Sequence, residues 1–141
     1  MEDIGSSISQ DYNAIVLGLR DYVLKSNFQK VVIGLSGGID SALVAVMAVD
    51  ALGSDNVACL GLPSKFNSKS SLDDAKQLSK NLGIKLELIA IQEIIDKVDQ
   101  HLAPLFKGKS RDVTEENIQS RIRAVLSVSY THLTLPTTPY V

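Results

Sequence analysis

The sequence predicts an α/β fold in which a Rossmann-like parallel sheet is flanked by helices. Three short apolar segments alternate strictly with segments of helical periodicity, which is the pattern of βαβ units. The first apolar segment leads into a glycine-rich loop that is followed at once by a helix. Because the strand segments are almost continuously apolar, we expect a sheet that is buried on both faces.

The first half of the chain contains a predicted helix, strand, helix and strand in that order. Apolar residues recur at spacings of three and four over residues 8–26, which predicts an amphipathic helix. "KVVIGLS" (30–36) is predicted to form a buried strand. "SALVAVMAVDALG" (41–53) is apolar on nearly every face and predicts a helix that ends at Gly53. "NVACLGLP" (56–63) predicts a second buried strand.

The second half repeats this alternation. "SLDDAKQLSKNLG" (71–83) predicts a helix, with Ser71 and Asp74 at the spacing of a capping box and Gly83 at its end. The remaining predicted elements are a strand over 85–91, a helix over 91–102 and a last helix capped by Thr114, with Ile118, Ile122 and Val125 as its apolar stripe.

Composition and charge exclude several classes of function. The net charge of −2 and the absence of a basic block give no support to nucleic-acid binding. The longest apolar stretch, 42–49, is too short to span a membrane, and the acidic N-terminus lacks the apolar centre of a signal peptide. Cys59 is the single cysteine, so no internal disulfide can form. These features favour a cytoplasmic protein with neither nucleic-acid nor membrane partners.

The loop "GLSGGIDSA" (34–42) has the composition of an anion-binding site. Glycines let backbone N–H groups approach a ligand closely, and a helix N-terminus directs unpaired N–H groups and partial positive charge at the same place. Ser36 and Ser41 add hydroxyl groups. Such a loop lies where ligands bind in open α/β sheets, beyond the carboxyl ends of the strands. We expect it to bind phosphate.

Asp40 distinguishes this loop from the common nucleotide-binding motifs. The chain lacks both the lysine of the triphosphate-binding P-loop and the G-x-G-x-x-G dinucleotide fingerprint. A carboxylate beside a polyphosphate is repelled unless a divalent cation lies between them, and Mg²⁺ binds phosphates together with one or two carboxylates. We therefore interpret Asp40 as a Mg²⁺ ligand. The alternative is a simple tight turn in which Asp40 caps the helix.

"SGGIDS" resembles the pyrophosphate-binding loop of the ATP pyrophosphatases, which cleave ATP between its α and β phosphates to adenylate a substrate. The flanking sequence, over residues 14–126, is similar to the synthetase domain of glutamine-dependent NAD synthetases. The resemblance implies an adenine nucleotide alpha hydrolase-like fold, of which this chain holds an incomplete part.

The resemblance also implies site residues. ATP would bind to the loop residues Gly34, Leu35, Ser36, Gly37, Gly38, Ile39, Asp40 and Ser41, with Asp40 on Mg²⁺. Deamido-NAD would contact Asn117 and Arg121. In the predicted last helix, Asn117 is in the first turn, beside free N–H groups, and Arg121 is one turn later, where it can pair with phosphate or carboxylate. No catalytic residue is assigned.

The implied reaction is the ATP-dependent amidation of deamido-NAD to NAD through an adenylate, with release of AMP and pyrophosphate. Its implied partners are ATP, deamido-NAD and ammonia or glutamine, in a full-length enzyme that is a homo-oligomer. Two alternatives remain open: another ATP pyrophosphatase amidotransferase, such as a GMP synthetase, and a non-catalytic nucleotide-binding module of the universal-stress-protein type.

The end of the chain departs in composition from the rest. Residues 1–127 are expected to form the N-terminal part of the synthetase domain, and residues 128–141 a non-native tail. "VSYTHLTLPT" (128–137) resembles the in-frame translation of a transposon adaptor used in preparing sequencing libraries. Pro136 and Pro139 prevent further helix, so we expect this tail to pack poorly or to leave the sheet. We also expect the 141-residue chain alone to be inactive.

Overall fold

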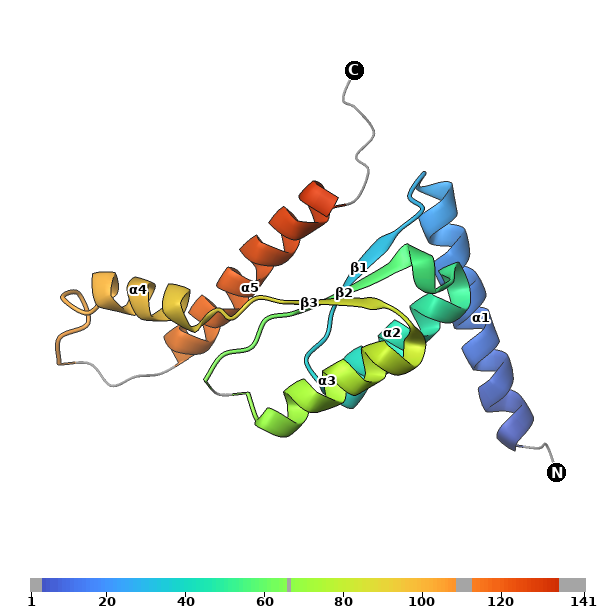
Figure 1. Cartoon of the computed structure of the whole chain (residues 1–141), viewed down its shortest axis with the longest axis horizontal. Helices are drawn as coiled ribbons and strands as arrows, with labels where there is room; N and C mark the ends of the chain where they lie inside the picture. The colour runs from blue at the N-terminus through green and yellow to red at the C-terminus, as the bar shows by residue number, and fades with distance from the viewer. Residues whose placement is uncertain (1–3, 66, 109–112, 135–141) are drawn as a thin grey trace, which may run out of the picture.

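The computed structural model describes residues 4–65, 67–108 and 113–134. This part of the chain contains three strands and five α-helices, which alternate up to α4 and are followed by α5 (Figure 1). In order they are α1 (Ile4–Lys25), β1 (Val31–Gly34), α2 (Ile39–Leu52), the short 3₁₀ helix η1 (Ser54–Asn56), β2 (Val57–Gly61), α3 (Lys69–Leu82), β3 (Lys85–Leu88), α4 (Gln92–Leu102) and α5 (Val113–Thr134). Among the described residues, no helix combines the length and the apolarity needed to cross a membrane.

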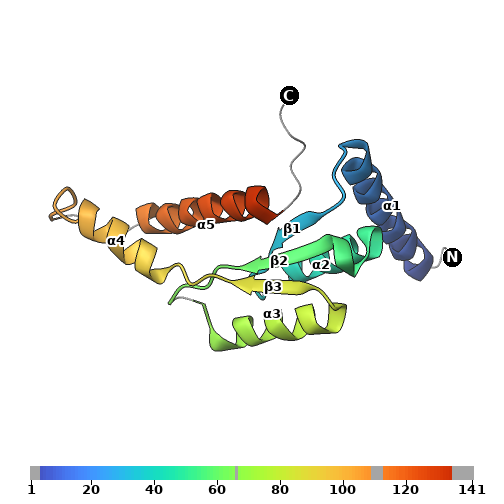
Figure 2. The same cartoon turned by 45° about the horizontal axis from the view of Figure 1, so that its top comes forward.

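The three strands form one parallel sheet in the order β1-β2-β3, which confirms the predicted α/β architecture. Cys59 in the central strand is in register with Ile33 on one side and Leu86 on the other. Helices cover both faces, with α3 on one side of the sheet and α5 on the other (Figure 2). Because the three strands are parallel, their carboxyl ends lie at the same edge of the sheet, and the loop after β1 begins there.

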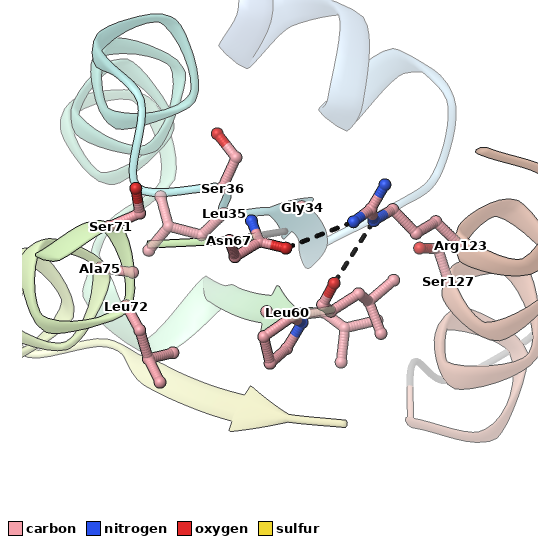
Figure 3. Close-up of a pocket in the computed structure, with 13 residues that line it drawn as sticks. Gly34, Leu35, Ser36, Leu60, Asn67, Ser71, Leu72, Ala75, Arg123 and Ser127 are labelled. Carbon is pink, nitrogen blue, oxygen red and sulfur yellow. Dashed lines mark hydrogen bonds between the residues drawn. The ribbon is translucent and has the colours of Figure 1, made fainter. Parts of the chain in front are cut away.

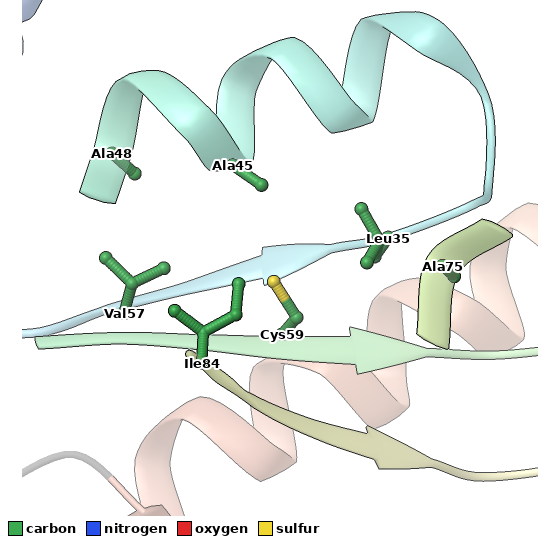
Figure 4. Packing of buried hydrophobic residues seen from close by; sticks show 7 residues of the cluster. All are labelled: Leu35, Ala45, Ala48, Val57, Cys59, Ala75 and Ile84. Carbon is green, nitrogen blue, oxygen red and sulfur yellow. The ribbon is translucent and has the colours of Figure 1, made fainter. Parts of the chain in front are cut away.

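The core lies between the sheet and the pair α2 and α3 (Figure 4). Ala45 and Ala48 are fully buried on the face of α2 that meets β1 and β2. Small side chains at these positions let the helix pack closely on the strands. Cys59 is completely buried beneath them, and this burial raises the pKa of its thiol to about 11. Cys59 is therefore a packing residue of the core.

The ends of α2 and α3 confirm the predicted glycine stops but correct the predicted start of α3. Gly53 and Gly83 follow the last residues of the two helices with positive φ angles of 82° and 66°. The capping box at Ser71 and Asp74 is wrong. Ser68 is the N-cap, and its Oγ accepts a hydrogen bond of 3.1 Å from the backbone N–H of Ser71. Ser68 supplies the same hydroxyl chemistry one turn earlier, so the helix begins at Lys69.

The start and apolar stripe of α5 also differ from the prediction. Thr114 is the second residue of the helix and not its cap. Ile118 and Ile122 are half-buried as expected, but the side chain of Val125 is exposed. The half-buried face of α5 therefore continues from Ile122 to Leu126 and not to Val125.

Residues 128–134 belong to the segment that we expected to pack poorly or to leave the sheet, and the side chains of Val128 and Leu133 are exposed. These residues continue α5 up to Thr134. The hydroxyl of Thr131 donates a hydrogen bond of 2.7 Å to the carbonyl of Ser127, and Tyr130 is half-buried. No proline interrupts the helix before residue 136, so helix geometry can persist this far. Pro136, Pro139 and the rest of 135–141 lie outside the described residues.

Candidate functional site

The glycine-rich loop joins the carboxyl end of β1 to the N-terminus of α2, as predicted. Gly38 is the N-cap residue, and no side chain caps the helix. The first backbone N–H groups of α2 are thus left for a ligand in the loop. Asp40 is the second residue of α2 and its carboxylate is exposed. The alternative in which Asp40 caps the helix is therefore wrong.

Two serine hydroxyls hold the loop in shape. The Oγ atoms of Ser36 and Ser41 lie 3.0 Å apart. Ser41 Oγ also accepts from the N–H of Ser36 at 3.2 Å and donates to the carbonyl of Gly38 at 3.1 Å. Ser36 Oγ accepts from the N–H of Gly38 at 3.2 Å. These bonds close the loop on itself, so its backbone is already curved before any ligand binds.

Gly37 is the position in this loop that requires a glycine. Its φ angle is +86°, which side chains rarely tolerate. A Cβ atom built on Gly37 would lie 2.1 Å from the carbonyl oxygen of Ser71, in the first turn of α3. The loop backbone therefore packs directly on α3, and the N-terminal turns of α2 and α3 meet at this edge of the sheet.

A cavity of about 360 Å³ opens beside the loop (Figure 3). Four parts of the chain line it: the end of β1 with its loop, the end of β2 with the segment after it, α3, and α5. The lining residues are Gly34, Leu35, Ser36, Leu60, Gly61, Leu62, Pro63, Asn67, Ser71, Leu72, Ala75, Arg123 and Ser127. Most of this wall is apolar, which suits a flat organic ring, and the loop supplies a polar end.

Arg123 connects α5 to the segment between β2 and α3. Its Nε donates to the carbonyl of Leu62 at 3.3 Å, and its Nη2 donates to Asn67 Oδ1 at 3.5 Å (Figure 3). Asn67 Oδ1 also accepts from the backbone N–H of Ser64 at 2.9 Å. Farther along, Ser64 Oγ lies 3.5 Å from Gln119 Oε1. A chain of polar contacts thus fixes α5 over the cavity.

The structure separates the predicted dinucleotide residues from this cavity. Asn117 and Arg121 are both exposed on α5 and do not line it. Arg121 and Arg123 are two residues apart, so roughly 200° of helix rotation places them on opposite faces. Sequence reasoning singled out Arg121 and missed Arg123. A usable signal was present, because Gln119, Arg123 and Ser127 repeat at a spacing of four, which marks one polar stripe.

The site offers one acidic side chain for a metal ion. No group of three or more metal-binding side chains occurs in the described part of the chain. Asp40 is the acidic residue of the loop, and the cavity lining contains none. A protein site with a single carboxylate fits Mg²⁺, which takes its remaining ligands from phosphates and water. Such a site forms only together with a bound polyphosphate.

The chain matches known proteins over most of its length. The family model described as NAD synthase matches residues 11–135. The chain is 56% identical over 119 residues to the glutamine-dependent NAD(+) synthetase of Rhodobacter capsulatus, which is 84% of this chain and 22% of that protein. With the enzyme of the same name from Thermotoga maritima it shares 51% identity over 112 residues, 79% of this chain and 19% of that one.

Solved structures show the same fold. The glutamine-dependent NAD+ synthetase of Acinetobacter baumannii, solved with adenosine diphosphate, superposes with a TM-score of 0.83 and 38% identity, covering 86% of this chain and 23% of that one. The NH3-dependent NAD synthetase of Campylobacter jejuni superposes with a TM-score of 0.75 and 34% identity over 88% of this chain and 52% of its own. The chain spans about a fifth of the length of the curated relatives described above.

Proposed function

The chain belongs to the NAD synthase family, and from this we propose that it is the ATP-binding part of a glutamine-dependent NAD synthetase. The observation that carries the proposal is the loop at 34–41. It is closed by Ser36 and Ser41, it packs on α3 through Gly37, and it opens into an apolar cavity. Phosphates bind at the loop and the N-terminus of α2, and the cavity holds the nucleoside.

The proposed reaction has two steps. The carboxylate of deamido-NAD attacks the α-phosphorus of ATP, and the bond to the β-phosphate oxygen breaks, giving an adenylate and pyrophosphate. Ammonia, derived from glutamine, then attacks the activated carbonyl carbon and displaces AMP, which leaves the amide of NAD. Neither step needs a nucleophile from this chain. Its contribution is to hold two anionic substrates in reach of each other.

The loop residues have separate tasks in this scheme. Backbone N–H groups at the start of α2 bind the phosphates, and the hydroxyls of Ser36 and Ser41 exchange their mutual contact for phosphate oxygens. Asp40 would hold Mg²⁺, which neutralises charge on the departing pyrophosphate when bound. Because Asp40 is in the first turn of α2 and points into solvent, its carboxylate is accessible to a hydrated ion.

The dinucleotide site is proposed on a different face of α5. Asn117 and Arg121 are one turn apart and exposed, so a ligand can reach both. Arg121 can pair with a phosphate or with the carboxylate that reacts. α5 would therefore stand between the two substrates, with ATP at its cavity side.

The other candidate functions are not favoured. The curated relatives described above are named as glutamine-dependent NAD(+) synthetases, and neither a GMP synthetase nor a stress-protein module is among them.

We also propose that the whole enzyme is a homo-oligomer. We likewise propose that residues 1–127 are the native part of this domain and residues 128–141 a foreign tail.

A segment exchange tests the proposed function. Residues 14–126 of this chain replace the matching segment of the full-length Thermotoga maritima enzyme, with which this chain shares 51% identity. The exchange protein should form NAD from deamido-NAD, ATP and glutamine, and the same protein with Asp40→Ala should not. A folded exchange protein that forms no NAD, under conditions in which the unmodified enzyme does, would overturn the proposal.

A further inference from the structure

Arg123 is a half-buried cation without an anionic partner among the described residues. The ion pairs of Lys25 with Asp21 and of Lys85 with Glu87 do not involve it. The hydrogen bonds of Arg123 go instead to two neutral oxygens, the carbonyl of Leu62 and the side-chain amide of Asn67. A guanidinium carries five N–H donors, and these two bonds use only two of them. Donors therefore remain for a ligand.

Arg123 is one of the residues that line the cavity. Arg123 reaches from α5 to the end of β2, across the cavity from Ser36 and Ser71 (Figure 3). Its two existing bonds are long, at 3.3 and 3.5 Å, so a ligand atom with better geometry can compete with them. The position of the side chain is nevertheless fixed, because both acceptors belong to the segment directly after β2.

The surroundings of Arg123 suit the nucleoside end of a nucleotide better than its phosphates. Leu60, Leu62 and Pro63 form the wall nearest to the guanidinium's acceptors, and they are apolar. The phosphate-binding features, a helix N-terminus and two serine hydroxyls, lie on the other side. A planar guanidinium can both stack on a base and donate to base or ribose acceptors.

We propose that Arg123 binds the nucleoside part of the nucleotide whose phosphates occupy the loop at 34–41. This assignment rests on the proposed function of the loop. It makes Arg123 a specificity-determining residue, because Arg123 would hold the part of the nucleotide that inorganic polyphosphate lacks.

The test compares two ligands on the 141-residue chain by isothermal titration calorimetry, MgATP and magnesium tripolyphosphate. Arg123→Met keeps the length of the side chain and removes its donors. It should weaken MgATP binding by about tenfold or more, the loss typical of hydrogen bonds from a charged donor. Tripolyphosphate binding should stay within about twofold of the parent value. Arg20→Met is the matched control, because the side chain of Arg20 on α1 is exposed, and it should change neither affinity.

The outcomes separate this inference from the proposed function. Unchanged MgATP affinity in Arg123→Met would overturn the inference alone. Equal weakening of both ligands would also overturn it, because the residue would then act on the phosphates or on the shape of the loop. If Arg123→Met does not fold, Arg123→Lys serves instead, with the same selective loss of MgATP expected. Failure of the parent chain to bind either ligand would overturn the phosphate loop itself, and the inference with it.

Discussion

Gly37 packs so closely on Ser71 that a Cβ atom at residue 37 would lie 2.1 Å from the Ser71 carbonyl oxygen. This relationship joins the loop after β1 to the first turn of α3. The two segments are separated by the whole of α2 and β2 in the sequence. The shape of the proposed phosphate site therefore depends on tertiary packing as well as on the glycines of the loop.

Gly37→Ala should displace the loop from α3 and abolish MgATP binding. Gly53→Ala is the matched control, because Gly53 has a similar φ angle of 82° but open space around its Cβ position. Both variants carry the strain of a side chain at positive φ, about 1–3 kcal/mol. Only Gly37→Ala adds the clash, so it should be the less stable in urea unfolding and the one that loses ATP. Equal stabilities with intact ATP binding would show that the loop adapts without cost.

The sequence predicted the sheet and the loop because these depend on local patterns. Strand composition, glycine stops and the loop "GLSGGIDS" are all visible in short windows. The spacing of Gln119, Arg123 and Ser127 marks a polar stripe in the sequence, but the contacts of Arg123 with Leu62 and Asn67 arise from tertiary packing, which no short window contains. The same is true of Ser68, where three nearby serines at 68, 70 and 71 offered equivalent caps and only the chain path chose among them.

Residues 128–134 show another limit of local patterns. Threonine and serine favour strands and turns over helix when taken alone, yet α5 continues through this segment to Thr134. Helix geometry does not reveal how a segment is encoded, so its foreign origin stays a prediction. Sequencing the locus from unamplified DNA should show a reading frame that continues after about codon 127 into further synthetase sequence. Finding "VSYTHLTLPT" encoded there would contradict it.

The effect of Asp40→Asn on ATP affinity should depend on whether Mg²⁺ is present. With Mg²⁺, the variant loses a metal ligand and should bind ATP about tenfold more weakly. In EDTA, the variant should bind ATP at least as tightly as the parent, since it no longer places a carboxylate beside the phosphates. Asp55→Asn, exposed in η1 at the opposite edge of the sheet, should behave like the parent in both conditions. A loss of ATP binding that is independent of Mg²⁺ would refute the metal assignment.

The thiol of Cys59 should be unreactive while the chain is folded. Burial raises its pKa to about 11 from 9.0, so about one thiol in a thousand is ionised at pH 8. Labelling with a chromogenic disulfide reagent should be slow in buffer and complete in denaturant.

Because folding raises the pKa of the Cys59 thiol, the stability that the buried neutral thiol contributes is present below pH 9 and is lost as the pH rises towards 11. Relative to that of Cys59→Ala, the free energy of unfolding of the parent should therefore fall between pH 9 and pH 11. Fast labelling of the thiol in buffer would contradict the packing of Cys59.

Asn117 and Arg121 should affect deamido-NAD and leave ATP alone. Asn117→Ala and Arg121→Ala each remove an exposed polar group from the face of α5 that turns away from the cavity. We expect each to weaken deamido-NAD binding by about tenfold, with MgATP binding unchanged within about twofold. Ser120→Ala, exposed on the same helix, is the control for helix stability. Together with Arg123→Met, these variants give opposite patterns from two arginines that are two residues apart. Equal weakening of both ligands by Arg121→Ala would mean that it acts through the stability of α5, and the separation of the two substrates by this helix would then be wrong.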